Sequence, residues 1–149
     1  MSVRAERSPD VADVRVGAEL PPLEVALTRS LIVAAAIASR DYQDVHHDPS
    51  LAVERGSKDI FMNILTTNGF VGRFVTDWAG PDARVTKVAI RLGVPNYAGD
   101  TMRLTGVVSA TDRATGTVEV AVRGANSLGD HVTGTVSIVL PLRSPERTE

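Results

Sequence analysis

The chain has 149 residues, of which 43% are hydrophobic, so it is long enough to form one domain that buries its own core. Its 16 Lys and Arg against 18 Asp and Glu give a formal charge of −2, and no basic block or aromatic–basic interleaving favours nucleic-acid binding. The absence of Cys excludes thiol nucleophiles, disulfide frameworks and Cys-based zinc sites, and fits a reducing compartment.

Charged residues interrupt the first 20 positions, which therefore contain no apolar stretch suited to export or to crossing a bilayer. We expect a cytoplasmic protein with no membrane association. The sequence predicts a flexible N-terminal segment over residues 1–19, a single domain over 20–142 and a flexible, polar tail over 143–149.

The first predicted element is the hydrophobic run LIVAAAI at residues 31–37, which has no period to separate a strand from a helix; we interpret it as a strand. A short helix of one or two turns should follow. There Asp48 can act as the N-cap, Pro49 suits the first turn and Gly56 can end the helix.

A long helix is predicted over residues 60–78, where apolar side chains recur three and four positions apart and stop before Gly80. Gly69 and Gly72 weaken such a helix by roughly 1 kcal/mol each. Close packing of the helix against a sheet would explain both glycines, and room for a bulky ligand is the alternative.

From residue 85 onward the hydrophobic period changes to two, which is typical of half-buried strands. Turn-like sequences separate four such stretches, near residues 88–94, 102–108, 118–122 and 132–140. The order of elements predicts an α+β domain in which an antiparallel sheet curls around the long helix. A free sheet edge would invite a partner subunit.

Titratable residues cluster in RDYQDVHHDP, residues 40–49. In a bent loop Asp41 and His46 can converge on one water molecule, as proton transfer requires, whereas in an extended strand they would face opposite sides. The plainer interpretation is a set of turn and cap acids with partly exposed loop histidines. Spacing leaves both open. The side chains of the adjacent His46 and His47 would diverge, so no metal site is expected. His131 is interpreted as a structural or interface residue.

The stretch DYQDVHHDPSLA resembles the signature of MaoC-like, R-specific enoyl-CoA hydratases, and YAGDTM, residues 97–102, resembles their second common stretch. RDYQDVHHDP, RGSKDIF, NILTT, VTDWAGPDA, RLGVP and SLGDHVTGTV more closely resemble the small catalytic subunits of heteromeric actinobacterial hydratases that act on steroid side-chain enoyl-CoA thioesters. The resemblance covers about residues 20–140. It implies a hotdog fold, an antiparallel sheet wrapped around one long central helix, and a second MaoC-like subunit.

By position, the resemblance implies that Asp41 and His46 are the catalytic residues, which hold the water that adds across the 2,3 double bond. The backbone N–H of Asn63 takes the place of the family's glycine N–H, which binds the thioester oxygen. The chain departs from the family at Gln43 and Asp44, where asparagine and proline are usual, and at Met62–Asn63, where His-Gly is usual. No cofactor is implied beyond the CoA that the substrate carries.

Two other functions stay open at the level of sequence. Hotdog domains also hydrolyse acyl-CoA thioesters, a reaction that releases free thiol. A non-catalytic subunit that binds an acyl-CoA or shapes a partner would not depend on the acid–base pair.

Overall fold

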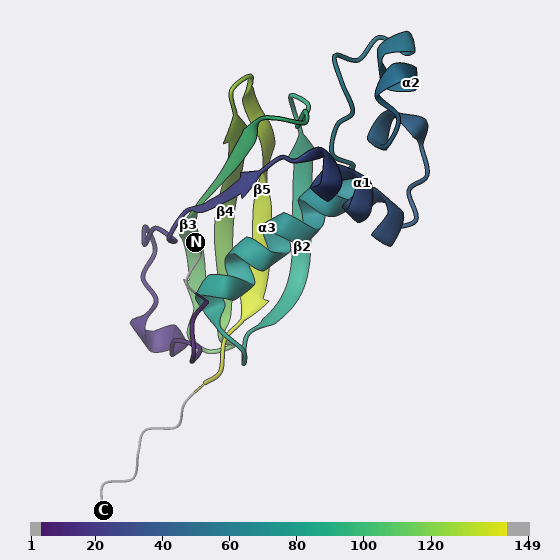
Figure 1. The fold of residues 1–149 in the computed structure, drawn as a ribbon. Coiled ribbons are helices and arrows are strands. Elements are labelled where there is room, and N and C mark those ends of the chain that lie inside the picture. Colours follow the sequence, from purple (N-terminus) through teal and green to yellow (C-terminus); the bar gives the residue numbers. More distant parts are fainter. Residues whose placement is uncertain (1–3, 143–149) are drawn as a thin grey trace, which may run out of the picture.

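The computed structural model describes residues 4–142, which form three helices, two single 3-10 turns and five strands (Figure 1). The helical elements are η1 (Val11–Asp13), α1 (Arg29–Ala38), η2 (Asp44–His46), α2 (Pro49–Glu54) and α3 (Ile64–Ala79). The strands are β1 (Leu23–Ala26), β2 (Arg84–Leu92), β3 (Thr101–Asp112), β4 (Thr117–Asn126) and β5 (Gly129–Val139). No helix within this described range is long and apolar enough to cross a membrane.

The five strands form one antiparallel sheet in the order β1-β3-β4-β5-β2, and α3 lies across one of its faces (Figure 1). Alternate strand residues point under the helix and are buried: Met102, Leu104, Val108, Val118, Val120, Val122, Val132, Val136 and Ile138. They meet Val71, Phe74 and Val75 of α3, which repeat at helical spacing. The predicted α+β arrangement and the four predicted C-terminal strands are confirmed.

Contact between α3 and the sheet depends on Gly106 in β3. A Cβ added there would lie 2.8 Å from an edge carbon of the Phe74 ring and 3.2 Å from Val120. The ring therefore occupies the space that a side chain at position 106 would need, and the helix can pack close to the strand.

The prediction of a strand over residues 31–37 is wrong, because these residues lie in α1. Thr28 accepts a hydrogen bond from the Leu31 N–H and so caps the helix, while Ile32 and Ala36 form its buried stripe. The early strand is instead β1, which pairs with the start of β3.

The long helix is confirmed, but it begins at Ile64 rather than at residue 60. The preceding residues are extended: the Met62 N–H donates to the Asn96 carbonyl, and Phe61 forms a bridge with Tyr97. The short helix is also confirmed as α2, whose first-turn N–H groups bind the Asp48 carboxylate.

Gly69 and Gly72 do not face the sheet. A Cβ added at either would meet nothing within 4 Å, so close helix–sheet packing does not explain these glycines. They share the outward side of α3 with Ile64 and Leu65, which are 51% and 53% exposed.

Much of the predicted flexible segment, residues 1–19, packs on the domain. Val11 and Val14 are buried, the Gly17 N–H donates to the Val108 carbonyl in β3, and the Val108 N–H donates to the Ala18 carbonyl. This stretch therefore belongs to the packed body, because its apolar side chains cover one end of the core. Residues 1–3 and the predicted tail, 143–149, lie outside the described residues.

Candidate active site

Asp41 is positioned by the way that α1 ends. The Arg40 N–H donates to the Ile37 carbonyl at 3.0 Å and the Asp41 N–H to the Ala36 carbonyl at 2.9 Å, a Schellman motif. Arg40 takes the left-handed conformation of that motif with φ of 57°. The chain reverses there, and the hydrogen bonds of Arg40 and Asp41 to the end of α1 fix the backbone at Asp41.

His46 is buried at the end of η2 and is fixed by the extended segment before α3. Its Nδ1 lies 2.7 Å from the Phe61 carbonyl oxygen, and the Phe61 N–H donates to the Val45 carbonyl at 3.2 Å. A carbonyl only accepts, so Nδ1 carries the hydrogen. The Phe61 ring packs edge-on against the imidazole, with 5.0 Å between centroids.

The free nitrogen, Nε2, faces Asp41, whose Oδ2 is 3.4 Å away. With hydrogen on Nδ1, a neutral imidazole presents a lone pair at Nε2, and the carboxylate also only accepts. One water molecule beside these two atoms could donate a hydrogen to each. The Asp41 side chain is 21% exposed and that of His46 is 7% exposed, so the pair is largely buried and Asp41 is its more accessible member.

The other titratable residues of the cluster point elsewhere. Asp44 forms a bidentate pair with Arg55 at 2.6 and 2.7 Å, and the hydrogen bonds from this guanidinium hold the pKa of Asp44 below its usual value. Asp48 caps α2 and His47 is exposed. Asp44 and Asp48 are thus turn and cap residues, whereas His46 is buried and lies beside Asp41; a catalytic role for that pair stays a prediction.

Sequence reasoning considered only the backbone of Asn63, but its side chain reaches the same place. The carboxamide Nδ2 donates to Asp41 Oδ2 at 3.1 Å and to Ser39 Oγ at 2.9 Å. Asn63 is also the N-cap of α3, since its Oδ1 accepts from the Thr66 N–H. Its own N–H has no acceptor within residues 4–142. Asparagine before a helical pattern was the available signal.

His131 is buried between β5 and α3. Its Nδ1 donates to the Val94 carbonyl at 2.7 Å and its Nε2 accepts from the Thr67 hydroxyl at 2.8 Å. Burial lowers the pKa of His131, which agrees with a neutral ring that has one donor and one acceptor. This geometry supports the structural interpretation and keeps His131 out of the Asp41–His46 pair.

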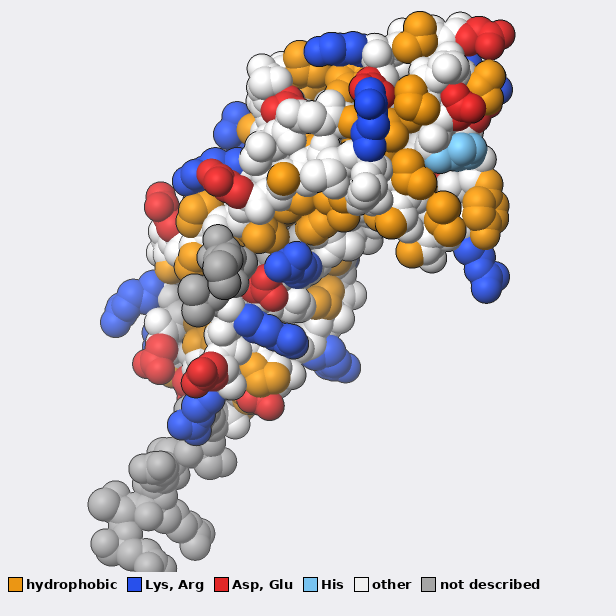
Figure 2. All heavy atoms as spheres, in the orientation of Figure 1, with side chains coloured by type: hydrophobic (Ala, Val, Ile, Leu, Met, Phe, Trp, Pro, Cys, Tyr) orange, Lys and Arg blue, Asp and Glu red, His pale blue; other side chains and the backbone are white. Residues whose placement is uncertain are grey.

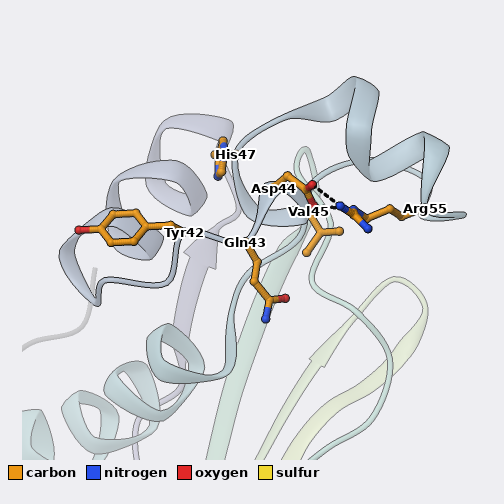
Figure 3. A pocket seen from close by; sticks show the side chains of 6 residues that line it. All are labelled: Tyr42, Gln43, Asp44, Val45, His47 and Arg55. Carbon is orange, nitrogen blue, oxygen red and sulfur yellow. Dashed lines mark hydrogen bonds and ion pairs between the residues drawn. The ribbon is translucent and has the colours of Figure 1, made fainter.

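A pocket of about 400 Å³ lies on the α2 side of the same loop (Figure 3). Its lining consists of Tyr42, Gln43, Asp44, Val45, His47 and Arg55. Neither Asp41 nor His46 lines it, and the Asp44–Arg55 pair across it already satisfies both charges. The pocket is therefore separate from the acid–base pair. Nowhere in the described part of the chain do three His, Cys, Asp or Glu side chains gather to hold a metal ion.

Exposed apolar side chains lie next in sequence to Asp41 and Asn63. Ile37 and Tyr42 flank the Ser39–Asp41 turn and are 54% and 68% exposed, while Ile64 and Leu65 follow Asn63. Figure 2 shows hydrophobic side chains gathered over the part of the surface formed by α1 and α2. Apolar surface that is left open beside polar chemistry is typical of a surface that another molecule covers.

No family model matches the chain. It is 54% identical over 123 residues to the 3-oxo-4,17-pregnadiene-20-carboxyl-CoA hydratase beta subunit of Mycobacterium tuberculosis, a match that covers 83% of this chain and 94% of the relative. The solved ChsH1–ChsH2 complex from the same organism contains a chain 52% identical, with a TM-score of 0.82 over 85% of this chain and 98% of that chain.

A MaoC-like dehydratase is also similar, with 27% identity and a TM-score of 0.84 over 95% of this chain and 45% of that chain. The predicted hotdog fold is confirmed by these likenesses together with the curled sheet and α3. The chain belongs to the family of MaoC-like hydratase subunits that includes the Mycobacterium tuberculosis beta subunit.

Proposed function

We propose that this protein is an enoyl-CoA hydratase that adds water across the 2,3 double bond of a CoA thioester. The observation that carries the proposal is the 3.4 Å approach of His46 Nε2 to Asp41 Oδ2, with the imidazole hydrogen committed to the Phe61 carbonyl. Two acceptors at this distance suit a water molecule that is to lose a proton.

In the proposed reaction the water oxygen forms a bond to C3 while the Asp41–His46 pair takes one of its protons. The electrons of the double bond move onto the thioester oxygen as an enolate. When they return, C2 accepts a proton from the pair. The product gains hydrogen at C2 and hydroxyl at C3, and the pair regains its starting protonation.

The enolate oxygen needs hydrogen-bond donors, and the start of α3 provides them. The N–H of Asn63 lies at the N-terminal end of a 16-residue helix, where unpaired N–H groups and the helix dipole favour negative charge. Loss of one such donor typically costs ~10²–10³ in rate. We therefore assign the thioester oxygen to this N–H.

For the substrate we propose a bulky steroid side-chain enoyl-CoA, in the degradation of a steroid such as cholesterol. The M. tuberculosis relative is named for a pregnadiene-carboxyl-CoA. The exposed Ile37, Tyr42, Ile64 and Leu65 around the pair supply apolar surface for such a group.

We also propose a second MaoC-like subunit as partner, since a 52% identical chain occurs in the ChsH1–ChsH2 complex. The partner would cover the apolar surface beside the pair and complete the acyl pocket. The proposed enzyme acts in the cytoplasm and needs no cofactor besides the CoA of its substrate.

The test follows the absorbance of the conjugated enoyl thioester with the chain alone and with its MaoC-like partner. We expect the band to fall without release of thiol, and Asp41→Asn and His46→Ala each to slow the change by ~10²–10⁴. Release of thiol would identify a thioesterase. An unchanged band with the partner present, or full activity in both variants, would point to a non-catalytic acyl-CoA-binding subunit.

A further inference from the structure

The Asn63 carboxamide is buried, and every hydrogen-bonding position on it is used. Nδ2 donates to Ser39 Oγ and to Asp41 Oδ2, while Oδ1 accepts from the Thr66 N–H at 3.2 Å and from the Thr66 hydroxyl at 2.5 Å. One side chain thus joins the end of α1, the loop at Asp41 and the first turn of α3.

The surroundings fix which way this amide points. The Ser39 hydroxyl donates to the Ala35 carbonyl at 2.8 Å, so its oxygen is left to accept. The Asp41 carboxylate also accepts, and the Thr66 N–H on the other side can only donate. A rotated amide would oppose acceptor to acceptor at two contacts and donor to donor at a third.

We propose that Asn63 is a positioning residue for Asp41, acting through its carboxamide in addition to the backbone N–H assigned above. This inference rests on the proposed hydratase function. The oxygen that Asn63 holds, Asp41 Oδ2, is the one that faces His46 Nε2 at 3.4 Å. Among the described residues, the other oxygen, Oδ1, accepts one long contact of 3.4 Å from the Gln43 N–H. Asn63 therefore controls the orientation of the carboxylate toward the reacting water.

A consequence is that one residue sets the distance between the two halves of the site. The Asn63 backbone is the proposed donor to the thioester oxygen, and its side chain holds the proton-transfer carboxylate. Reacting groups lose rate steeply when they are misplaced by about 1 Å. Because all groups around Asn63 come from different elements, this side chain maintains their spacing.

The competing explanation is that Asn63 only caps α3, and Asn63→Ser separates the two. Serine is as good an N-cap as asparagine, so α3 keeps its cap, but its hydroxyl is too short to hold Asp41 as the carboxamide does. Asn63→Asp provides a second variant that keeps the cap oxygen and replaces the donor to Asp41 by a repelling carboxylate. Asn68→Ser is the matched control, the same exchange at an exposed position of α3.

The experiment measures kcat and KM of the complex with the MaoC-like partner on an enoyl-CoA, together with thermal unfolding of each variant. We expect Asn63→Ser to lower kcat about 10- to 100-fold with KM within about twofold, because orientation is lost and binding is not. Asn63→Asp should lower kcat further, and Asn68→Ser should match the wild type.

The inference is overturned if the wild-type complex hydrates the substrate and Asn63→Ser keeps the wild-type kcat. It is overturned equally if kcat falls only in proportion to the folded fraction seen by thermal unfolding. A wild-type complex that leaves the enoyl thioester intact would instead overturn the proposed function, so the two failures are distinct.

Discussion

Two regions of the molecule are held together by different physics. The body, formed by α3 and the sheet, is joined by buried apolar side chains such as Phe74 and Val120. The segment from the end of α1 to the start of α3 is joined by caps and polar side chains, including Asp48, Asn63 and the His46–Phe61 hydrogen bond. The proposed catalytic residues lie in the second region, where a few directional hydrogen bonds hold the chain. Substitutions there should therefore affect activity, and substitutions in the body should affect stability.

The largest effect is expected at Asp41, where activity and stability should separate. Asp41→Asn keeps the shape of the side chain but removes the charge that handles protons, so kcat/KM should fall by ~10²–10⁴. The free energy of unfolding should change by less than about 1 kcal/mol, because the side chain is partly exposed. Urea unfolding checks this, and a large loss of stability would break the separation between the regions.

Phe74→Ala should give the opposite result. The ring is buried against Gly106 and Val120, so its removal leaves a cavity and should cost about 3–5 kcal/mol of unfolding free energy. Activity of the fraction that stays folded should be close to that of the wild type. Denaturant unfolding combined with activity below the transition measures both, and a stable but inactive variant would contradict the comparison.

His131 is a titratable residue buried in the body, so the pH dependence of stability reports on it. Burial lowers its pKa in the folded state, which means that the unfolded chain binds more protons as pH falls below about 6.5. The stabilisation is present above that pH and is lost as the pH falls toward the folded-state pKa. Melting temperatures at pH 8 and 5 should therefore differ less for His131→Gln than for the wild type. An equal shift in both would assign the acid sensitivity to other groups.

The smallest expected effect is a gain in stability at Arg40. Its φ of 57° places an arginine where the Schellman motif favours glycine, so Arg40→Gly should stabilise the protein by about 1 kcal/mol. Arg40→Ala is the control, because it removes the charge and keeps the Cβ. Chemical unfolding should rank glycine above arginine and alanine, and equal stabilities would show that the turn is free of strain.

The body was the more predictable region, because burial on one face imposes a period that the sequence displays. Strand residues such as Val118, Val120 and Val122 alternate clearly, and α3 follows from its buried stripe. The prediction for residues 31–37 was wrong, because a run of apolar residues at every position has no period that separates a helix from a strand. Its alanines and the capping Thr28 were the signals that favoured a helix.

The site could be predicted only as residue types in one loop. The convergence of Asp41 and His46 requires a Schellman turn with arginine in the left-handed conformation, which composition does not indicate. The Asn63 side chain was missed because the apolar pattern continues back to Ile60 and hides the true start of α3. A capping role is visible only when the helix boundary is known.

The two edge strands of the sheet differ in length, and this difference affects where a strand from another chain can be added. β1 is a four-residue border, whereas β2 offers nine residues whose outer backbone groups have no neighbouring strand in the part of the chain that the structure describes. If two copies pair only through their β2 strands, the pair is closed, because the long sheet edge of each copy is then occupied. Extension of the sheet is therefore favoured at β2 over β1, because the longer border offers more unpaired backbone groups to a neighbouring strand.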